Sequence, residues 1–164
     1  MRFIMIRNIL SCLILLPILN ITNISTNKGI DKTLTLKIVT QCSTYYKGDL
    51  INISVQISNR GNSDKLIPLV MIPEDYWLKF EIYDGENKKL RYTGPKYKVR
   101  HVNEKLLLLP DHFYGKKIEI TNLYSGLLKL GKYKIRAVYG IPPVDNYIFI
   151  GPIYSNIINI EVIK

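Results

Sequence analysis

The chain has 164 residues, 47% of them hydrophobic, and a formal net charge of +10 at pH 7. This length suits one domain with a buried core, and the apolar fraction excludes a disordered chain. Twelve tyrosines, together with abundant Ile, Val and Leu, favour β-structure over helix. The positive charge favours anionic partners such as lipid headgroups, acidic glycans or nucleic acid, although lysines also keep the sheet edges of a secreted protein unpaired.

The N-terminal segment has the charged, apolar and then polar order of a secretory signal peptide. Arg2 and Arg7 precede an apolar run, Ile9–Leu19, that is too short for a comfortable membrane span. We therefore predict a signal peptide over residues 1–25 and a secreted or periplasmic protein without a transmembrane span in its mature chain. An uncleaved membrane anchor and a lipoprotein are the alternatives, and the lipoprotein is disfavoured because the apolar run continues past Cys12.

The mature chain is then a short polar leader over residues 26–32 and one domain over residues 33–164. Its net charge is +8, because the charges of Arg2 and Arg7 are subtracted from the +10 of the whole chain. Cys42 is left as its single cysteine, so no internal disulfide can form. We expect Cys42 to be a small buried hydrophobe rather than a nucleophile.

Alternation of apolar and polar residues predicts strands along the whole domain. The predicted strands cover residues 34–40, 50–58, 77–83, 89–92, 116–121, 128–140 and 155–163. Residues 46–49 and 84–87 are expected to form turns, residues 59–63 a loop, and residues 65–75 an edge strand or a crossing segment, because Pro68 and Pro73 exclude a central strand. The strand over 128–140 is predicted to lie at the centre of a sheet, with the strand over 155–163 beside it.

Two short patterns carry a resemblance to known domains. Leu128, Gly131 and Tyr133 form a Leu-x-x-Gly-x-Tyr arrangement that resembles the tyrosine corner of immunoglobulin-like and fibronectin-like sandwiches. The segment over residues 47–61 is similar to the second strand of many bacterial surface and envelope immunoglobulin-like modules. The resemblance implies an all-β, single immunoglobulin-like Greek-key β-sandwich of about seven to nine strands, and it assigns no activity.

The sequence contains no recognisable catalytic or metal-binding motif. Cys42, His112 and Asp111 could be combined into a catalytic set, but no local signature supports them. His101 and His112 are the only histidines, which is fewer than the three or four locked ligands that a metal site requires. We therefore expect no enzyme activity, no metal and no cofactor.

Two segments are candidates for binding. The last long loop is rich in prolines and aromatic side chains, which make rigid contact surfaces; its candidate residues are Ile141, Pro142, Pro143, Tyr147, Phe149 and Tyr154. Basic residues interleaved with tyrosines form a second candidate, a basic patch; its residues are Lys96, Lys98, Arg100, Lys132, Lys134 and Arg136.

These observations lead to one functional expectation and two alternatives. We expect a non-enzymatic module that contacts another protein through loops at one end of the sandwich. One alternative is a proteinase inhibitor with an immunoglobulin fold, although the Asn-Pro-Thr-Thr-Gly loop of chagasin-like inhibitors does not occur here. The other alternative is a basic surface module that binds an anionic glycan or lipid. Secretion argues against a nucleic-acid partner.

Overall fold

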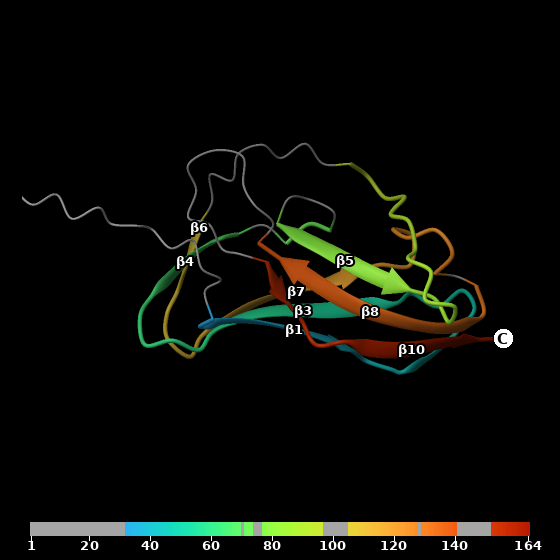
Figure 1. The fold of residues 1–164 in the computed structure, drawn as a ribbon, viewed down its shortest axis with the longest axis horizontal. Helices are drawn as coiled ribbons and strands as arrows, with labels where there is room; N and C mark the ends of the chain where they lie inside the picture. The colour runs from blue at the N-terminus through green and yellow to red at the C-terminus, as the bar shows by residue number, and fades with distance from the viewer. Residues whose placement is uncertain (1–31, 70, 74–76, 97–104, 128, 141–151) are drawn as a thin grey trace, which may run out of the picture.

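The computed structural model describes residues 32–69, 71–73, 77–96, 105–127, 129–140 and 152–164. These residues form strands and no helix (Figure 1). The strands are β1 (Leu34–Thr40), β2 (Thr44–Tyr46), β3 (Asn52–Asn59), β4 (Lys65–Pro68), β5 (Leu78–Tyr83), β6 (Lys105–Leu108), β7 (Phe113–Glu119), β8 (Gly131–Tyr139), β9 (Ile153–Tyr154) and β10 (Ile158–Ile163). Within the described part of the chain, no helix is long and apolar enough to cross a membrane.

Two sheets make the body of the molecule. One has the strand order β1-β3-β7 and the other has the order β2-β10-β8-β5, with β9 beside β8. Neighbouring strands are antiparallel except β2 and β10, which are parallel. Three strands facing four in this order is the arrangement of an immunoglobulin-like sandwich. The all-β sandwich predicted from the sequence is therefore confirmed, with β8 in the interior of its sheet.

The core forms because alternate side chains of facing strands point into the space between the sheets. On β3, Ile53, Val55 and Ile57 are at most 1% exposed, and on β8, Ile135 and Ala137 are fully buried. These faces are the ones that the alternation predicted. Ser58 lies on the opposite face of β3 and is nevertheless buried; its cross-strand neighbours are Thr35 and Phe113.

The last predicted strand is interrupted. Tyr154 pairs with Val138 and Ile158 pairs with Ile135. The three residues between Tyr154 and Ile158 therefore oppose only the two residues between Val138 and Ile135 on β8. Ser155 fills the interruption by donating its backbone N–H to the carbonyl of Ala137, 2.9 Å away, and accepting that residue's N–H at its hydroxyl. Such a one-residue excess is a β-bulge. It divides one strand into β9 and β10, which is one reason that ten strands are found.

Residues 65–75 supply an edge strand, as predicted, whereas the strand predicted over residues 116–121 has other bounds. The first segment supplies β4, which pairs with β6 in a separate two-stranded ribbon. The predicted strand over 116–121 begins earlier, at Phe113. β4 and the start of β7 lie at one corner, where the β3–β7 ladder ends and the β4–β6 ladder begins.

Asn59 holds that corner together. Its fully buried side chain donates to the carbonyl oxygens of Ser63 and Leu108, at 2.8 and 2.9 Å, and accepts the N–H of Gly61. The ribbon thereby turns away from the sheet and stands across one end of the sandwich (Figure 1). A buried hydrogen bond of 2.8 Å from the Tyr139 hydroxyl to the carbonyl of Pro68 attaches the ribbon to β8. We call this end of the molecule, with β4, β6 and the start of β7, the ribbon end.

Candidate interaction surfaces

The tyrosine corner lies at the opposite end, where the chain enters β8. The Tyr133 hydroxyl lies 2.8 Å from the carbonyl oxygens of both Gly126 and Lys129, just upstream in the chain. Burial raises the pKa of this hydroxyl, and the nearby Asp84 carboxylate raises it further. Gly131 has a φ of +144°, which a side chain would strain. Leu128 lies outside the described residues.

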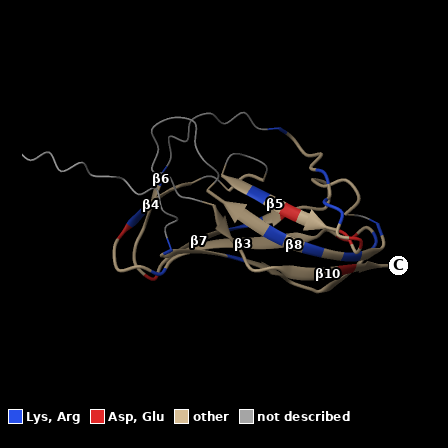
Figure 2. Ribbon diagram, viewed as in Figure 1, with Lys and Arg blue, Asp and Glu red and all other residues tan. Residues whose placement is uncertain are grey.

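The outer face of β8 carries the predicted cations. Lys132 and Lys134 are exposed and Arg136 is partly exposed, while the residues between them point into the core. Acidic residues stand on the neighbouring strands: Glu81 of β5 is opposite Arg136, and Glu161 of β10 is opposite Lys132. The face therefore has mixed charge, as the blue and red bands of Figure 2 show.

Glu81 uses both of its carboxylate oxygens. Its Oε2 accepts hydrogen bonds from Nη2 and Nε of Arg136, at 2.5 and 3.1 Å, and its Oε1 accepts one from Nζ of Lys89 at 3.2 Å. The bond to Arg136 is the main cause that lowers the pKa of the Glu81 carboxyl, and partial burial opposes it. Arg136 and Lys89 are therefore both paired with Glu81 of the same chain.

Of the six candidate residues of the predicted contact loop, Tyr154 is the one that the structure describes. It is 53% exposed on β9, and the Arg136 guanidinium lies 4.7 Å from the centre of its ring. This contact is a cation–π interaction, and it places the Tyr154 ring beside a charged group. The other loop residues lie outside the described part of the chain; they are Ile141, Pro142, Pro143, Tyr147 and Phe149.

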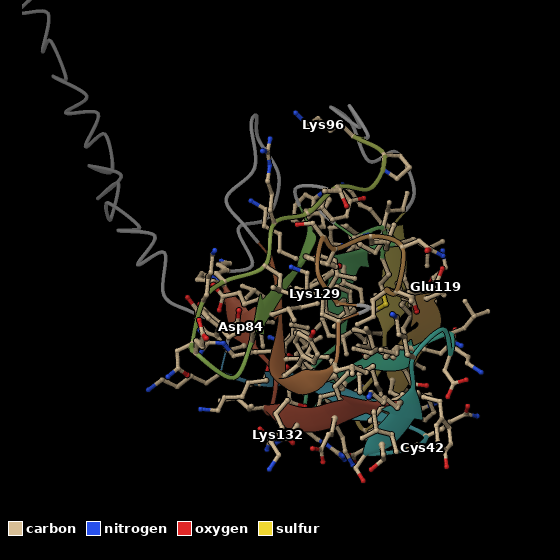
Figure 3. All side chains as sticks on the ribbon, turned by 90° about the vertical axis from the view of Figure 1, so that its right-hand side faces the viewer. Cys42, Asp84, Lys96, Glu119, Lys129 and Lys132 are labelled. Atoms are coloured by element: carbon tan, nitrogen blue, oxygen red, sulfur yellow. The ribbon has the colours of Figure 1, made fainter. Side chains whose placement is uncertain are left out.

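The predicted basic patch is only partly assembled in the described structure. Lys98 and Arg100 lie outside the described residues. Lys96 and Lys132 are described, and Figure 3 places them on opposite sides of the molecule. Lys134 donates to the side-chain oxygen of Asn87 at 3.4 Å. The β8 cations therefore have neighbours other than the ones expected from the sequence.

Those neighbours come from two segments that sequence reasoning did not assign to a site. One is the hairpin over residues 84–91, which follows β5, and the other is the segment over residues 125–130, which precedes β8. Together with Lys132 they line one groove; the added cations are Lys88, Lys89, Arg91 and Lys129. Charge alternation within β8 alone could not reveal them, because they lie on separate segments of the chain.

The ribbon end exposes apolar side chains instead. Leu66 of β4 and Leu107 of β6 are cross-strand partners and are 38% and 55% exposed, while Ile67 and Leu108 on the other face of the ribbon are buried. Phe113, at the start of β7, is 65% exposed. The ribbon therefore has one face in the core and an apolar face in solvent.

The residues considered for catalysis lie far apart. Cys42 follows the end of β1 that pairs with Ile53, whereas the carbonyl of His112 accepts the N–H of Asn59 at the other end of β3. Six strand residues separate these ends by roughly 20 Å. Cys42 is exposed, so the expectation of a buried thiol was wrong. It lies in the short crossing between β1 and β2, where residues 41–43 are all exposed.

Metal ligands are also dispersed in the described structure. His101 lies outside the described residues, and the Nδ1 of His112 is 2.9 Å from the carbonyl oxygen of Pro110. Among the residues that the structure describes, no three His, Cys, Asp or Glu side chains are grouped closely enough to hold a metal ion.

No family model and no curated protein matches this sequence. Several solved structures are similar to it, and three of them are described here. The crystal structure of the CARDB domain of the PF1109 protein from Pyrococcus furiosus, in complex with di-metal ions, has 16% identity and a TM-score of 0.41, covering 79% of this chain and 91% of that chain. The solution structure of the same domain has 12% identity and a TM-score of 0.40, covering 80% and 94%.

The third is the crystal structure of Spo0M, a sporulation control protein from Bacillus subtilis, with 12% identity and a TM-score of 0.40. The match covers 79% of this chain and 49% of that chain.

Proposed function

We propose that this chain is a non-enzymatic module outside the cytoplasm that binds another protein through its ribbon end. The observation that carries the proposal is the exposed pair of Leu66 and Leu107 on a ribbon whose other face is buried. Grouped apolar side chains on a soluble domain are typical of protein interaction sites, because burying them against a partner is favourable. Leu109, which follows β6, and Phe113, at the start of β7, are also exposed at this end, by 42% and 65%.

The attachment point of the predicted contact loop also favours binding at the ribbon end. The loop begins after Gly140, whose N–H donates to the carbonyl of Trp77 at the end of β8 that the ribbon contacts through Tyr139. The residues predicted to bind are therefore attached at the end that carries the exposed leucines. Location outside the cytoplasm rests on the signal-peptide pattern of residues 1–25, and the non-enzymatic assignment rests on the lack of a catalytic motif in the sequence.

The proposal is tested by capture of a partner from envelope extract with matched variants of the mature chain. We expect wild-type protein to retain a specific protein, and the double variant Leu66→Ser with Leu107→Ser to lose it. The control is Tyr46→Ser with Leu50→Ser, which removes two side chains that are more than 60% exposed at the other end of the sandwich. A deletion of residues 142–149 tests the loop in the same assay.

Two results would contradict the proposal. One is a partner that all variants retain equally, which would place binding elsewhere on the molecule. The other is a capture experiment in which the wild-type chain retains no protein better than the Leu66→Ser, Leu107→Ser double variant does. Circular dichroism of each variant shows whether the fold is intact, so a loss of binding is not mistaken for unfolding.

A further inference from the structure

A basic groove lies at the end of the sandwich opposite the ribbon end (Figure 3). It has a volume of about 640 Å³ and runs between the hairpin over residues 84–91 and a second wall made of residues 125, 126 and 129–133. Figure 3 looks onto this end, with Asp84, Lys129 and Lys132 around it. Its volume falls in the range of sites that bind small molecules, roughly 300–1,000 Å³.

The walls of the groove are held at a fixed separation. At one end, the N–H and hydroxyl of Ser125 both donate to the carbonyl of Arg91, at 2.9 and 3.3 Å. At the other end, Gly85 is within ordinary van der Waals range of the backbone of β8, since an added Cβ would lie 3.8 Å from the Lys132 carbonyl oxygen. The groove is therefore preorganised, which lowers the entropic cost of binding.

The hairpin wall is itself stabilised by Asp84. Its Oδ1 accepts the N–H groups of Glu86 and Lys88, at 3.0 and 2.9 Å. These two hydrogen bonds hold the turn of the hairpin in place beside the groove.

Five cations line the groove against two carboxylates, those of Asp84 and Glu86. The cations are Lys88, Lys89, Arg91, Lys129 and Lys132. Lys89 is paired with Glu81, but within the described part of the chain the other four make no ion pair. The groove therefore carries an excess of positive charge that an anionic ligand would neutralise.

Apolar groups complete the groove. Leu90 is half-buried and Leu130 is 46% exposed, and both line it beside the cations. The single aromatic residue that lines it in the described structure, Tyr133, is only 4% exposed, so no ring is available for stacking a nucleic-acid base. A flat bilayer surface would not reach the floor of a groove between two walls. The lining fits a narrow chain that has acidic groups at its sides and apolar patches on its faces.

We propose that this groove binds an acidic oligosaccharide. The carboxylate or sulfate groups of the sugars accept hydrogen bonds from the lysines and from Arg91, and the C–H faces of the sugar rings lie on Leu90 and Leu130. This site is separate from the protein-binding surface proposed above, because the two lie at opposite ends of the sandwich.

The test is titration calorimetry of the mature chain with two probes, a heparin oligosaccharide and an oligogalacturonate. The groove variant is Lys129→Gln with Lys132→Gln. The control is Lys37→Gln with Lys117→Gln, which removes the same charge from exposed positions on the other sheet. We expect the groove variant to bind at least about fivefold more weakly, as loss of two exposed charge contacts implies. The control should change the affinity by less than about twofold, and binding by wild type should weaken with salt.

An equal loss in both variants would overturn the proposal, since the binding would then follow net charge alone. Absence of binding by both oligosaccharides at low salt would also overturn it. Inorganic polyphosphate and phosphatidylglycerol vesicles are titrated in parallel, and a stronger groove-dependent affinity for either would show that the sugar assignment is wrong. Chemical-shift changes of the Leu90, Gly126 and Leu130 amides on addition of the oligosaccharide are expected in nuclear magnetic resonance spectra.

Discussion

The side-chain amide of Asn156 makes two hydrogen bonds to the backbone of Ile38, although the two residues are 118 positions apart. The Asn156 oxygen accepts the N–H of Ile38 at 2.9 Å, and its nitrogen donates to the carbonyl of the same residue at 3.0 Å. Asn156 lies in the bulge between β9 and β10, and Ile38 is in β1. One side chain thus takes the place of a neighbouring strand and joins the two sheets.

The outer edge of β5 is closed in a similar way. The carbonyl of Ile82 accepts the N–H of Leu90 at 2.8 Å, and the carbonyl of Phe80 accepts the hydroxyl of Tyr124 at 3.3 Å. Open sheet edges invite pairing with other chains, so these contacts favour a molecule that does not aggregate through β1 or β5.

Replacement of Asn156 should therefore destabilise the fold. In Asn156→Ala, both backbone groups of Ile38 lose their partner where water has limited access, and we expect the free energy of unfolding to fall by about 1–3 kcal/mol. Urea unfolding followed by tryptophan fluorescence measures it. Asn159→Ala on β10 is the control, since this exposed side chain makes no hydrogen bond to the described residues. Equal stability of the two variants would contradict the role assigned to Asn156.

The tyrosine corner should contribute through its hydroxyl. Tyr133→Phe keeps the buried ring and removes the contact to the carbonyls of Gly126 and Lys129, so we expect a loss of about 1–2 kcal/mol in the free energy of unfolding. Tyr46→Phe, at a position that is 63% exposed, should leave stability unchanged. If both variants unfold at the wild-type urea concentration, the corner is not a stabilising feature of this sandwich.

The ion pair of Glu81 with Arg136 should make stability depend on pH. The folded-state pKa of Glu81 is lowered from its ordinary 4.5, so its stabilisation is present above that value and is lost as the pH falls through the lowered pKa. At neutral pH, Glu81→Gln should reduce the free energy of unfolding by about 0.5–1 kcal/mol. The difference from wild type should disappear at the lowest pH at which both proteins still fold.

Urea unfolding of both proteins across this pH range checks the prediction. Glu86→Gln serves as the control, because Glu86 is exposed and the described structure gives its side chain no ion pair. A difference between wild type and Glu81→Gln that persists unchanged into acid would show that the contribution is not electrostatic.

The exposed thiol of Cys42 should react in the native state. In a chain in which Cys12 is replaced by serine, we expect a disulfide reagent such as Ellman's reagent to modify Cys42 without denaturant, at a rate within about tenfold of that in urea. A thiol that reacts only on unfolding would contradict the exposed position. Modification should leave the unfolding midpoint nearly unchanged, since the side chain is exposed in the folded protein.

Much of the sandwich could be predicted because the signal is local. The period-two alternation in β1, β3, β5 and β8 identifies which side chains are buried, whatever the neighbouring strand is. The turn over residues 46–49 was predictable for the same reason: Gly48 adopts a φ of +103°, and the Asp49 carboxylate accepts the N–H of Tyr46 at 2.8 Å. A turn of this kind depends on four consecutive residues.

The candidate surfaces depended on longer-range information. Alternation predicts that Arg136 points outward, but only the β5–β8 register places Glu81 opposite it. Asn59 belonged to a predicted loop, yet it is the buried centre of a corner made by three segments. The exposure of Cys42 likewise depends on where the chain crosses between the two sheets.

The sequence by itself determined the fold class and the inward faces of the main strands, because burying alternate side chains requires only a periodic pattern. The tertiary structure alone decided which charges pair, how the β1 and β5 edges are closed and which cations share a groove. The physical reason is that these features arise between segments distant in the chain. Their meeting is set by strand register and by the bulge and corner at Asn156 and Asn59, which no local pattern encodes.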